Sequence, residues 1–296
     1  MRIAVIGRSG QLARALDAAP LPASDWKLQN FGRPDLDIAD ADGVNTVLGA
    51  WQPDLVINAA AYTAVDRAES EPDAAYAINL DGVQHLSDTA KRLDMPLIHV
   101  STDYVFDGTG TQPYRETDPV APLGVYGQSK FAGEEALRET HAKHIILRTA
   151  WVHSPWGANF VKTMLRLGAE RTDLNVVGDQ TGTPTYAPDL ADAILKIAGR
   201  LRDVNTGDAR WGTYHLTNSG QTTWFDLPVE IFAAASRAGH KTPNLTRIPT
   251  RDYPTPAKRP AYSVLDSSKL ESAFEIRLRD WDDAARDCVE HLRANQ

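Results

Sequence analysis

The sequence has 296 residues and a formal net charge of −8, with 42% hydrophobic and 24% charged residues. A chain of this length can bury a substantial core in one or two domains. The negative charge argues against a general nucleic-acid binder, which presents a basic surface to the phosphate backbone. No apolar stretch is long enough to span a membrane, and the single cysteine, Cys288, cannot form an internal disulfide. We therefore expect a soluble, cytoplasmic protein that binds neither nucleic acid nor membrane.

The first half of the chain alternates short apolar runs with stretches of helical spacing. The predicted strands are residues 3–6, 27–31, 55–58, 97–101 and 144–148, and the most regular predicted helices are residues 11–18, 74–93 and 126–141. The strongest runs are continuously apolar, as in strands that are buried on both faces of a parallel sheet. The order predicts an α/β fold, a Rossmann-type doubly wound parallel sheet with a smaller C-terminal substrate-binding region.

Beyond residue 151 the pattern loosens, and proline and glycine become frequent. Further helices are expected at residues 159–167, 188–200, 224–238 and 281–292, the last of which would bury Cys288 as a packing residue. We expect residues 1–150 to form an NAD(P)-binding domain. Residues 151–296 would form mainly the substrate-binding region, with some segments returning to the first domain.

A glycine loop follows the first predicted strand and opens a helix. Gly7 and Gly10 allow a sharp turn and a close approach to a pyrophosphate at the helix N-terminus, and Ala13 is the third small residue. Glycines also end strands for structural reasons alone. The position of this loop, between a strand and a helix, is what favours a dinucleotide. Its spacing indicates the short-chain dehydrogenase branch of such folds.

The end of the second strand bears on the choice between NADPH and NADH. An acidic residue there would bind a ribose 2′-hydroxyl and favour NAD, but this strand leads into Arg33. A guanidinium can hold a 2′-phosphate in a bidentate manner, so the sequence favours NADPH. A solvated loop arginine is the alternative, and NADH, or use of both cofactors, remains open.

Three residues form a candidate catalytic set. Tyr126 and Lys130 are four residues apart, so on a helix they share one face. A nearby ammonium favours the phenolate and would lower the pKa of Tyr126, making its hydroxyl a general acid toward a carbonyl. Thr102, just after the fourth strand, can donate a hydrogen bond to the same carbonyl oxygen. Each feature alone is commonplace, but their combination and order predict a carbonyl reductase.

Six segments resemble the extended short-chain dehydrogenase/reductase family, over nearly the whole chain. They are residues 7–12, 58–66, 101–108, 126–130, 147–152 and 253–260. The resemblance is strongest to the members that complete dTDP-L-rhamnose synthesis. It implies NAD(P)H-dependent reduction of the C4 keto group of dTDP-4-dehydro-β-L-rhamnose to dTDP-β-L-rhamnose.

The resemblance also implies roles for individual residues. Cofactor contacts would come from Gly10, Gln11, Leu12, Asp37, Ile38, Ala61, Tyr62, Thr63 and Val100. Tyr126 would be the proton donor, and Lys130 would also bind the nicotinamide ribose. Thr102 and Asp103 would lie against the sugar, which Trp151 would help to position. The chain departs from the family at Ala13, often a glycine, and at His153, often a tyrosine, where the substrate pocket would be adjusted.

Several alternatives stay open. Another 4-keto sugar-nucleotide reductase would share the cofactor domain, and a non-catalytic NADP-binding regulatory subunit would share the fold. An epimerase or dehydratase is disfavoured, because a dehydratase would need further carboxylates before Tyr126. Some relatives are homodimers that hold Mg²⁺, but no ligand cluster in this sequence supports a metal. His141 and His144 are interpreted as surface-loop residues rather than metal ligands.

Overall fold

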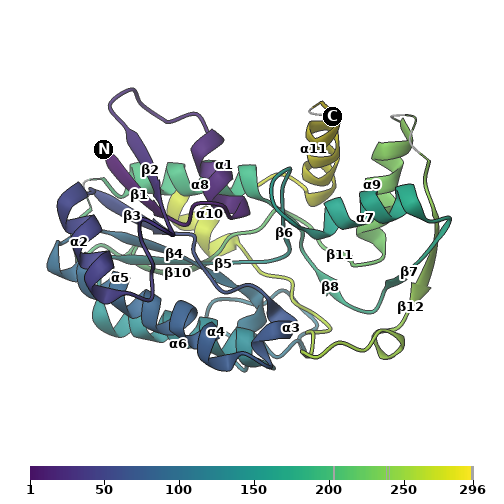
Figure 1. Ribbon diagram of the computed structural model, residues 1–296, viewed down its shortest axis with the longest axis horizontal. Helices are drawn as coiled ribbons and strands as arrows, with labels where there is room; N and C mark the ends of the chain where they lie inside the picture. The colour runs from purple at the N-terminus through teal and green to yellow at the C-terminus, as the bar shows by residue number, and fades with distance from the viewer. Residues whose placement is uncertain (203, 238, 240, 295–296) are drawn as a thin grey trace.

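The protein, described here from a computed structural model, contains a large parallel sheet between two layers of helices and a smaller lobe beside it (Figure 1). The structure describes residues 1–202, 204–237, 239 and 241–294. The α/β fold with a doubly wound parallel sheet is therefore as predicted.

The sheet has six parallel strands in the order β2–β1–β3–β4–β5–β10. Their bounds are β1 (Arg2–Ile6), β2 (Lys27–Phe31), β3 (Leu55–Asn58), β4 (Leu97–Thr102), β5 (His144–Thr149) and β10 (Gly212–His215). The first five confirm the five predicted strands to within one residue. The strand order reverses direction at β1, between β2 and β3. Such a switch point leaves a crevice at the carboxyl ends of the strands.

Two helical layers cover the sheet. One face packs against α1 (Gln11–Ala18), α8 (Ala187–Arg200) and α10 (Ser268–Phe274), and the other against α2 (Ala41–Trp51), α5 (Gly82–Arg92) and α6 (Val125–Thr140). Two hydrophobic clusters, one on each face, form the core of this part. Both β10 and α8 come from beyond residue 150. The division into two domains at that residue stays a prediction.

The helix predicted at residues 74–93 is continuous but not uniform. It consists of α4 (Pro72–Tyr76), the π-helical turn η1 (Ala77–Asp81) and α5 (Gly82–Arg92), preceded by the short α3 (Val65–Ala68). A π turn contains one more residue than an α turn, and such turns occur frequently at functional sites. Here the turn carries the fully buried Asn79.

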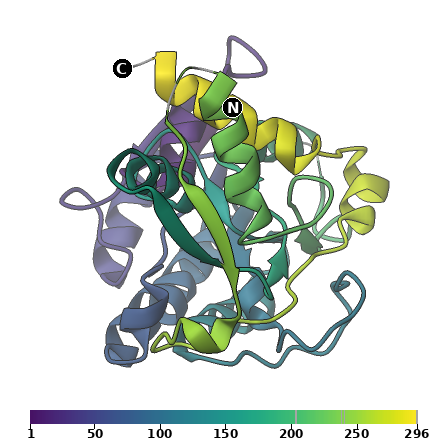
Figure 2. The same cartoon turned by 90° about the vertical axis from the view of Figure 1, so that its right-hand side faces the viewer.

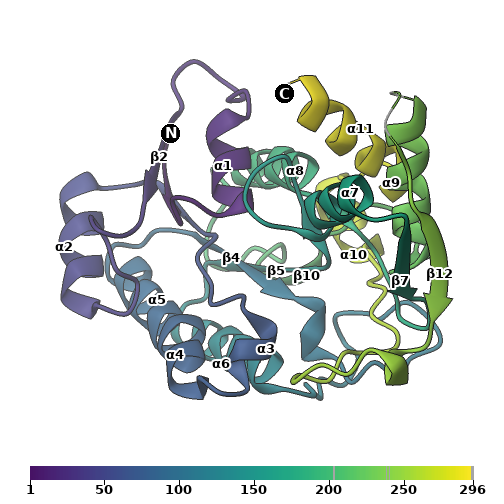
Figure 3. The same cartoon turned by 45° about the vertical axis from the view of Figure 1, so that its right-hand side comes forward.

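The smaller lobe has its own hydrophobic core and lies to one side of the sheet (Figures 2 and 3). It contains α7 (Phe160–Glu170), α9 (Asp226–Arg237) and α11 (Trp281–Ala294), together with β7 (Asp173–Val177), which pairs in parallel with β12 (Asn244–Ile248). Cys288 is buried in this core, as expected. Helix α9 begins two residues later than predicted, where the Thr223 hydroxyl accepts the Asp226 N–H at 3.1 Å. Ala238, the predicted end of that helix, lies outside the described residues.

The remaining elements are short. They are β6 (Val152–His153), β8 (Thr181–Gly182), β9 (Thr185–Tyr186), β11 (Thr222–Thr223) and the 3-10 turns η2 (Asp103–Val105) and η3 (Thr250–Asp252). β6 pairs with β9 and β11 pairs with β8. The segment directly after β5 therefore runs into the lobe.

Gly127 fixes how closely α6 approaches the rest of the protein. A Cβ built on Gly127 would lie 2.2 Å from the Tyr104 carbonyl oxygen. We expect Gly127→Ala to lower the free energy of unfolding by about 1–3 kcal/mol, the usual cost of overpacking. Urea unfolding measures this change.

Gly49 in α2 provides the matched control, because a Cβ there would meet no atom within 4 Å. Gly49→Ala should stabilise the protein by about 0.5–1 kcal/mol, as alanine does in an open helical position. Equal stability of the two variants would show that α6 can move away from Tyr104 at no cost.

Candidate active site

A cavity at the crevice between β1 and β3 gathers most of the residues predicted to bind the cofactor. Its volume is about 350 Å³. The predicted residues that line it are Gly7, Gly10, Arg33, Asp37, Ile38, Ala61 and Tyr62. They come from the carboxyl ends of three neighbouring strands, which is where a dinucleotide binds in this type of sheet.

The glycine loop has the geometry that a pyrophosphate needs. Gly7 has a φ of 127°, and a Cβ there would lie 3.3 Å from the Ala59 backbone, so the turn requires glycine. A Cβ at Gly10 would meet no atom within 4 Å, which leaves open space in front of α1. No side chain caps this helix, and its first turn contains no acidic residue. Its free N–H groups and positive dipole end therefore suit an anion.

Two arginines border the same cavity. Arg33 lies with its Nε 3.5 Å from Asp37 Oδ2, and its side chain is 72% exposed. Arg8, inside the glycine loop, forms an exposed ion pair with Asp35 and also lines the cavity. Arg8 was not predicted from the sequence, because a residue between two loop glycines gives no sign of where its side chain points.

Other predicted cofactor residues lie apart from this cavity. The Leu12 side chain is buried in the core, so only its backbone is available to a ligand. Thr63 is exposed and does not line the cavity. Gln11 reaches the chain after β5: its Nε2 donates to the Val152 carbonyl at 3.1 Å, and its Oε1 accepts from Ser154 Oγ at 2.9 Å. Gln11 thus connects the glycine loop to the segment that enters the small lobe.

The predicted hydroxyl pair meets at the carboxyl end of β4. Thr102 ends β4, and its hydroxyl donates to Asp103 Oδ1 at 3.0 Å. The Tyr126 side chain, in the first turn of α6, lies close enough to Thr102 for that hydroxyl to act on the pKa of the phenol. Burial raises the pKa of Tyr126 to about 12, an effect that Thr102 opposes and Asp103 adds to. Tyr126 therefore holds its proton at neutral pH.

Lys130 lies one helical turn further along α6 and is almost completely buried. Its Nζ donates to the Val100 carbonyl at 2.8 Å and lies 3.2 Å from His99 Nε2. Burial lowers the pKa of Lys130 to about 8, although Glu134 opposes this change. We expected the lysine to lower the pKa of Tyr126, but the structure shows the opposite direction. Burial of the tyrosine dominates, and the lysine points to Val100 and His99.

Two residues that the sequence analysis missed hold this cluster in place. Glu69 Oε1 accepts the Val125 N–H at 2.9 Å and so caps α6 from outside the helix. Asn79 Oδ1 accepts the Tyr62 N–H at 2.9 Å, and its Nδ2 donates to Ser129 Oγ at 3.0 Å. The π turn thus links the loop after β3 to α6. No local pattern identifies such residues, because their partners lie far away along the chain.

The cluster also contains a buried carboxyl group. Asp103 is 2% exposed, and burial raises its pKa to about 6. Among the described residues its Oδ2 forms no hydrogen bond of normal geometry, although the nearby Ser263 side chain opposes the effect of burial on the pKa. A buried acceptor without a partner is costly.

Trp151 follows β5 in a strained conformation, with a φ of 48°. Its ring stacks on Trp224 with a centroid distance of 3.7 Å, and a Cβ on Gly182 would lie 2.5 Å from it. His153 is buried behind it and stacks on Tyr186 at 5.6 Å. The Trp151 ring therefore has a fixed place at the border of the two lobes.

An ion pair holds the segment at residues 253–260 in the same region. Arg259 donates two hydrogen bonds to the Asp66 carboxylate, at 2.9 and 2.8 Å. The Ala257 N–H donates to Asp66 as well, at 3.2 Å. Two of the family-like segments, far apart in sequence, therefore meet beside α3.

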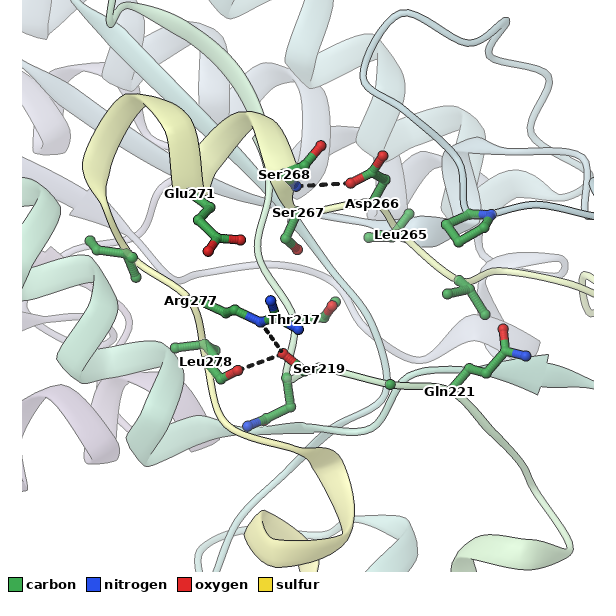
Figure 4. A pocket seen from close by; sticks show the side chains of 15 residues that line it. Thr217, Ser219, Gln221, Leu265, Asp266, Ser267, Ser268, Glu271, Arg277 and Leu278 are labelled. Carbon is green, nitrogen blue, oxygen red and sulfur yellow. Dashed lines mark hydrogen bonds between the residues drawn. The ribbon is translucent and has the colours of Figure 1, made fainter.

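A cavity of about 530 Å³ lies away from these residues, between the loop after β10, α10 and residues 276–278 (Figure 4). Some of its polar groups bind one another: Ser219 Oγ donates to the Leu278 carbonyl at 2.6 Å, and the Ser268 N–H donates to Asp266 at 2.9 Å. None of the predicted site residues lines it. The crevice at the β1–β3 switch remains the candidate site.

Across residues 1–202, 204–237, 239 and 241–294, no three His, Cys, Asp or Glu side chains cluster as metal ligands, and no helix is both long and apolar enough to cross a bilayer. The interpretation of His141 and His144 as surface residues is wrong. Both are buried, and His141 Nε2 lies 2.8 Å from the Met95 carbonyl oxygen, because the end of α6 packs against the start of β4.

Comparison with known proteins places these features in context. Residues 1–294 match the family described as RmlD substrate binding domain. A dTDP-4-dehydrorhamnose reductase of Sinorhizobium fredii is 45% identical over 98% of this chain and 97% of its own. A crystal structure of such a reductase from Clostridium acetobutylicum has a TM-score of 0.91 at 37% identity, covering 99% of this chain and 100% of that one. Another, from Bacillus anthracis in complex with NADP, has a TM-score of 0.89 at 34% identity, covering 100% and 99%.

Proposed function

The chain belongs to the RmlD substrate binding domain family, and from this membership we propose that it reduces the C4 keto group of dTDP-4-dehydro-β-L-rhamnose to give dTDP-β-L-rhamnose. The observation that carries the proposal is the convergence of the Thr102 and Tyr126 hydroxyls at the carboxyl end of β4. Two hydroxyls at one point can both reach a single carbonyl oxygen.

The crevice fits a nicotinamide cofactor. The open space at Gly10 and the uncapped start of α1 suit its pyrophosphate, and the cavity lined by Asp37 and Ile38 suits its adenosine. Val100, Lys130 and Tyr126 would lie at the nicotinamide end. Bound there, a reduced nicotinamide supplies the hydride that C4 accepts.

The protein's own residues then supply the proton. Tyr126 keeps its hydroxyl proton at neutral pH and donates it to the sugar carbonyl oxygen as negative charge develops there. Thr102 donates a hydrogen bond to the same oxygen, for which its hydroxyl turns away from Asp103. Asp103 lies beside Thr102 on the sugar side, and Trp151 borders the sugar on the side of the small lobe.

Arg33 and Arg8 support a preference for NADPH, because both border the adenosine end of the cavity. We expect Arg33→Ala to raise the KM for NADPH about tenfold, and the double variant with Arg8→Ala to raise it further. The KM for NADH should stay nearly unchanged in both variants. The reason is the loss of charge-assisted hydrogen bonds to the 2′-phosphate. Steady-state kinetics with each cofactor gives the ratio.

Arg171, an exposed arginine at the end of α7, supplies the control for a change in overall charge. Arg171→Ala should change neither KM. Equal increases in the KM values for NADPH and NADH in the Arg8 and Arg33 variants would mean that these arginines do not bind the 2′-phosphate.

The direct test of function is turnover. Purified protein is mixed with NADPH or NADH and the 4-dehydro-rhamnose nucleotide, and the loss of reduced-nicotinamide absorbance is followed together with the identity of the product. Formation of dTDP-rhamnose supports the proposal. A product of other C4 stereochemistry would favour another 4-keto sugar-nucleotide reductase. Cofactor binding without turnover would favour a regulatory subunit.

A further inference from the structure

The backbone and the side chain of Gln11 face two different parts of the protein. Gln11 is the first residue of α1, and its N–H belongs to the uncapped helix start that suits a pyrophosphate. Its side chain extends instead to residues 152–159, which follow Trp151 and lead into α7. Among the described residues, no other member of the glycine loop at residues 7–12 forms a hydrogen bond with this segment.

Three hydrogen bonds join the Gln11 side chain to the segment. Nε2 donates to the Val152 carbonyl at 3.1 Å, while Oε1 accepts from Ser154 Oγ at 2.9 Å and from Asn159 Nδ2 at 3.0 Å. Gly157 turns the chain around this side chain. It has a φ of 66°, and a Cβ there would lie 3.4 Å from Gln11 Cγ. The segment therefore encloses the glutamine instead of touching it at one point.

Asn159 determines which way the Gln11 amide points. Its Oδ1 accepts the Lys162 N–H at 3.1 Å and so caps α7, and its Nδ2 donates to the Ser154 carbonyl at 2.7 Å. The nitrogen of Asn159 is thus the atom that meets Gln11, and its partner there must be the acceptor Oε1. The donor Nε2 is then left for the Val152 carbonyl. One orientation of the amide satisfies all three contacts.

The same segment begins at the border of the sugar site. Val152, which accepts from Gln11, directly follows Trp151 and pairs with Thr185 in β9. Trp151 has a φ of 48°, a strained conformation that persists only where the neighbouring chain holds it. The place of the Trp151 ring therefore depends on the place of Val152, and through it on Gln11.

We propose that Gln11 is a positioning residue that couples the two binding events. A pyrophosphate on its backbone N–H fixes the glycine loop, and its side chain then fixes the segment that borders the sugar. The inference rests on the proposed function, in which the pyrophosphate lies at α1 and the sugar beside Trp151. Glycines allow the loop several backbone conformations, from which a bound anion selects one. Because coupling is reciprocal, the sugar nucleotide also tightens the binding of the cofactor.

The first experiment follows the segment without the sugar. Amide hydrogen exchange of the full chain is measured with and without 2′-phospho-ADP-ribose, which contains the pyrophosphate of NADPH but not its nicotinamide. Slower exchange in residues 7–12 reports that this fragment is bound. We expect it also to slow exchange in residues 152–159 by at least about fivefold. Unchanged exchange in residues 152–159 of the original protein would overturn the proposal.

Gln11→Met removes the connection from the side of the loop. Methionine is also unbranched, but it cannot donate to Val152 and is only a weak acceptor. With the fragment bound, residues 7–12 should still be protected, because the backbone N–H groups remain, and residues 152–159 should not. The same protection of both segments as in the original protein would contradict the role of the side chain.

Asn159→Asp breaks the connection from the other side and carries the test if Gln11→Met does not fold. An aspartate still caps α7, but it replaces the Nδ2 donor by an oxygen that faces Gln11 Oε1. The glycine loop is unaltered. Protection of residues 7–12 should therefore stay and protection of residues 152–159 should fall. Full protection of both segments in a folded Asn159→Asp protein would overturn the proposal.

Calorimetry measures the coupling itself. The Kd for dTDP-β-L-rhamnose, the proposed product, is determined with and without 2′-phospho-ADP-ribose. We expect the fragment to lower this Kd at least about fivefold in the original protein and less than about twofold in Gln11→Met. The fragment has no nicotinamide to touch the sugar, so the effect would have to pass through the protein. An equal factor in the two proteins would overturn the proposal.

Gln84→Met is the matched control. Gln84 Nε2 donates to Thr140 Oγ1 at 3.0 Å, between α5 and α6 on the other face of the sheet from α1. This variant should keep both the protection and the coupling. If the fragment protects residues 152–159 through Gln11 but dTDP-β-L-rhamnose does not bind, the proposed function fails while the connection stands. If the protein forms dTDP-rhamnose and the segment is not protected, the inference about Gln11 fails alone.

Discussion

Tyr126→Phe is expected to lower kcat for reduction of the sugar nucleotide by about 10²–10⁴-fold, the usual contribution of a positioned general acid. The ring remains in place, because it packs edge-on against Tyr104 with a centroid distance of 5.6 Å. Only the proton is lost. KM for the cofactor and the thermal midpoint should therefore change little, and steady-state kinetics with a melting curve separates these quantities.

Tyr114→Phe is the matched control for the removal of a tyrosine hydroxyl. This hydroxyl donates to Asp107 at 2.9 Å and accepts the Gly110 N–H at 2.8 Å, in a loop outside the crevice. The variant should lose some stability and keep its kcat. A Tyr126→Phe protein with nearly full activity would show that another group, or water, supplies the proton.

The largest effect on stability is expected at the buried ion pair between α6 and β5. Arg148 and Glu134 are at most 2% exposed and joined by hydrogen bonds of 2.7, 2.9 and 3.2 Å. Arg148→Met leaves the carboxylate buried with Arg138 as its remaining partner. We expect the free energy of unfolding at pH 7 to fall by about 3–5 kcal/mol, the usual cost of breaking such a pair from one side.

The pH dependence of the free energy of unfolding gives a second test of this ion pair. Burial by itself raises the pKa of Glu134, but the two arginines more than offset it, so the pKa lies below its ordinary value. The folded state of the original protein thus gains stability from Glu134 at neutral pH and loses it as the pH falls below the ordinary value. In Arg148→Met burial prevails and the pKa rises. That variant should recover stability as the pH is lowered from 7 toward 5.

Lys196→Met supplies the control at a solvent-exposed pair. Lys196 lies 2.7 Å from Asp192 on α8, and both side chains are more than half exposed. Its loss should cost no more than about 0.5 kcal/mol. Denaturant unfolding compares the three proteins, and an equal cost for Arg148→Met and Lys196→Met would contradict the expected role of burial.

Sequence patterns were sufficient to predict an element wherever one physical cause dominated its formation. The strands at residues 3–6 and 55–58 are recognisable because they are buried on both faces and continuously apolar. The loop from Gly7 to Gly10 is recognisable because backbone geometry demands small residues there. Helix α2 was not singled out, since it contains Gly43 and Gly49. β12 was missed as well, because it exposes most of its side chains at the border of the small lobe.

The parts of the candidate site that escaped prediction are long-range polar contacts. Asn79 meets Tyr62 and Ser129, which lie 17 and 50 residues away. His99 meets Lys130, 31 residues further along the chain. A single polar residue in an apolar run shows that a partner must exist, but it does not show which one. The direction of the shift in the pKa of Tyr126 was also predicted wrongly, because helical spacing places Lys130 nearby without showing that its Nζ turns toward Val100.

The position of β10 and α8 has a consequence for how this protein can be divided. Both elements come from beyond residue 150, yet β10 completes the large sheet and α8 packs its apolar side on α1. A fragment that stopped at residue 150 would leave β5 as an open sheet edge and expose one of the two core clusters to water. Residues 1–150 are thus not a detachable module. Exchange of substrate preference between relatives would have to proceed through loops, such as the one around Trp151, rather than through transfer of whole domains.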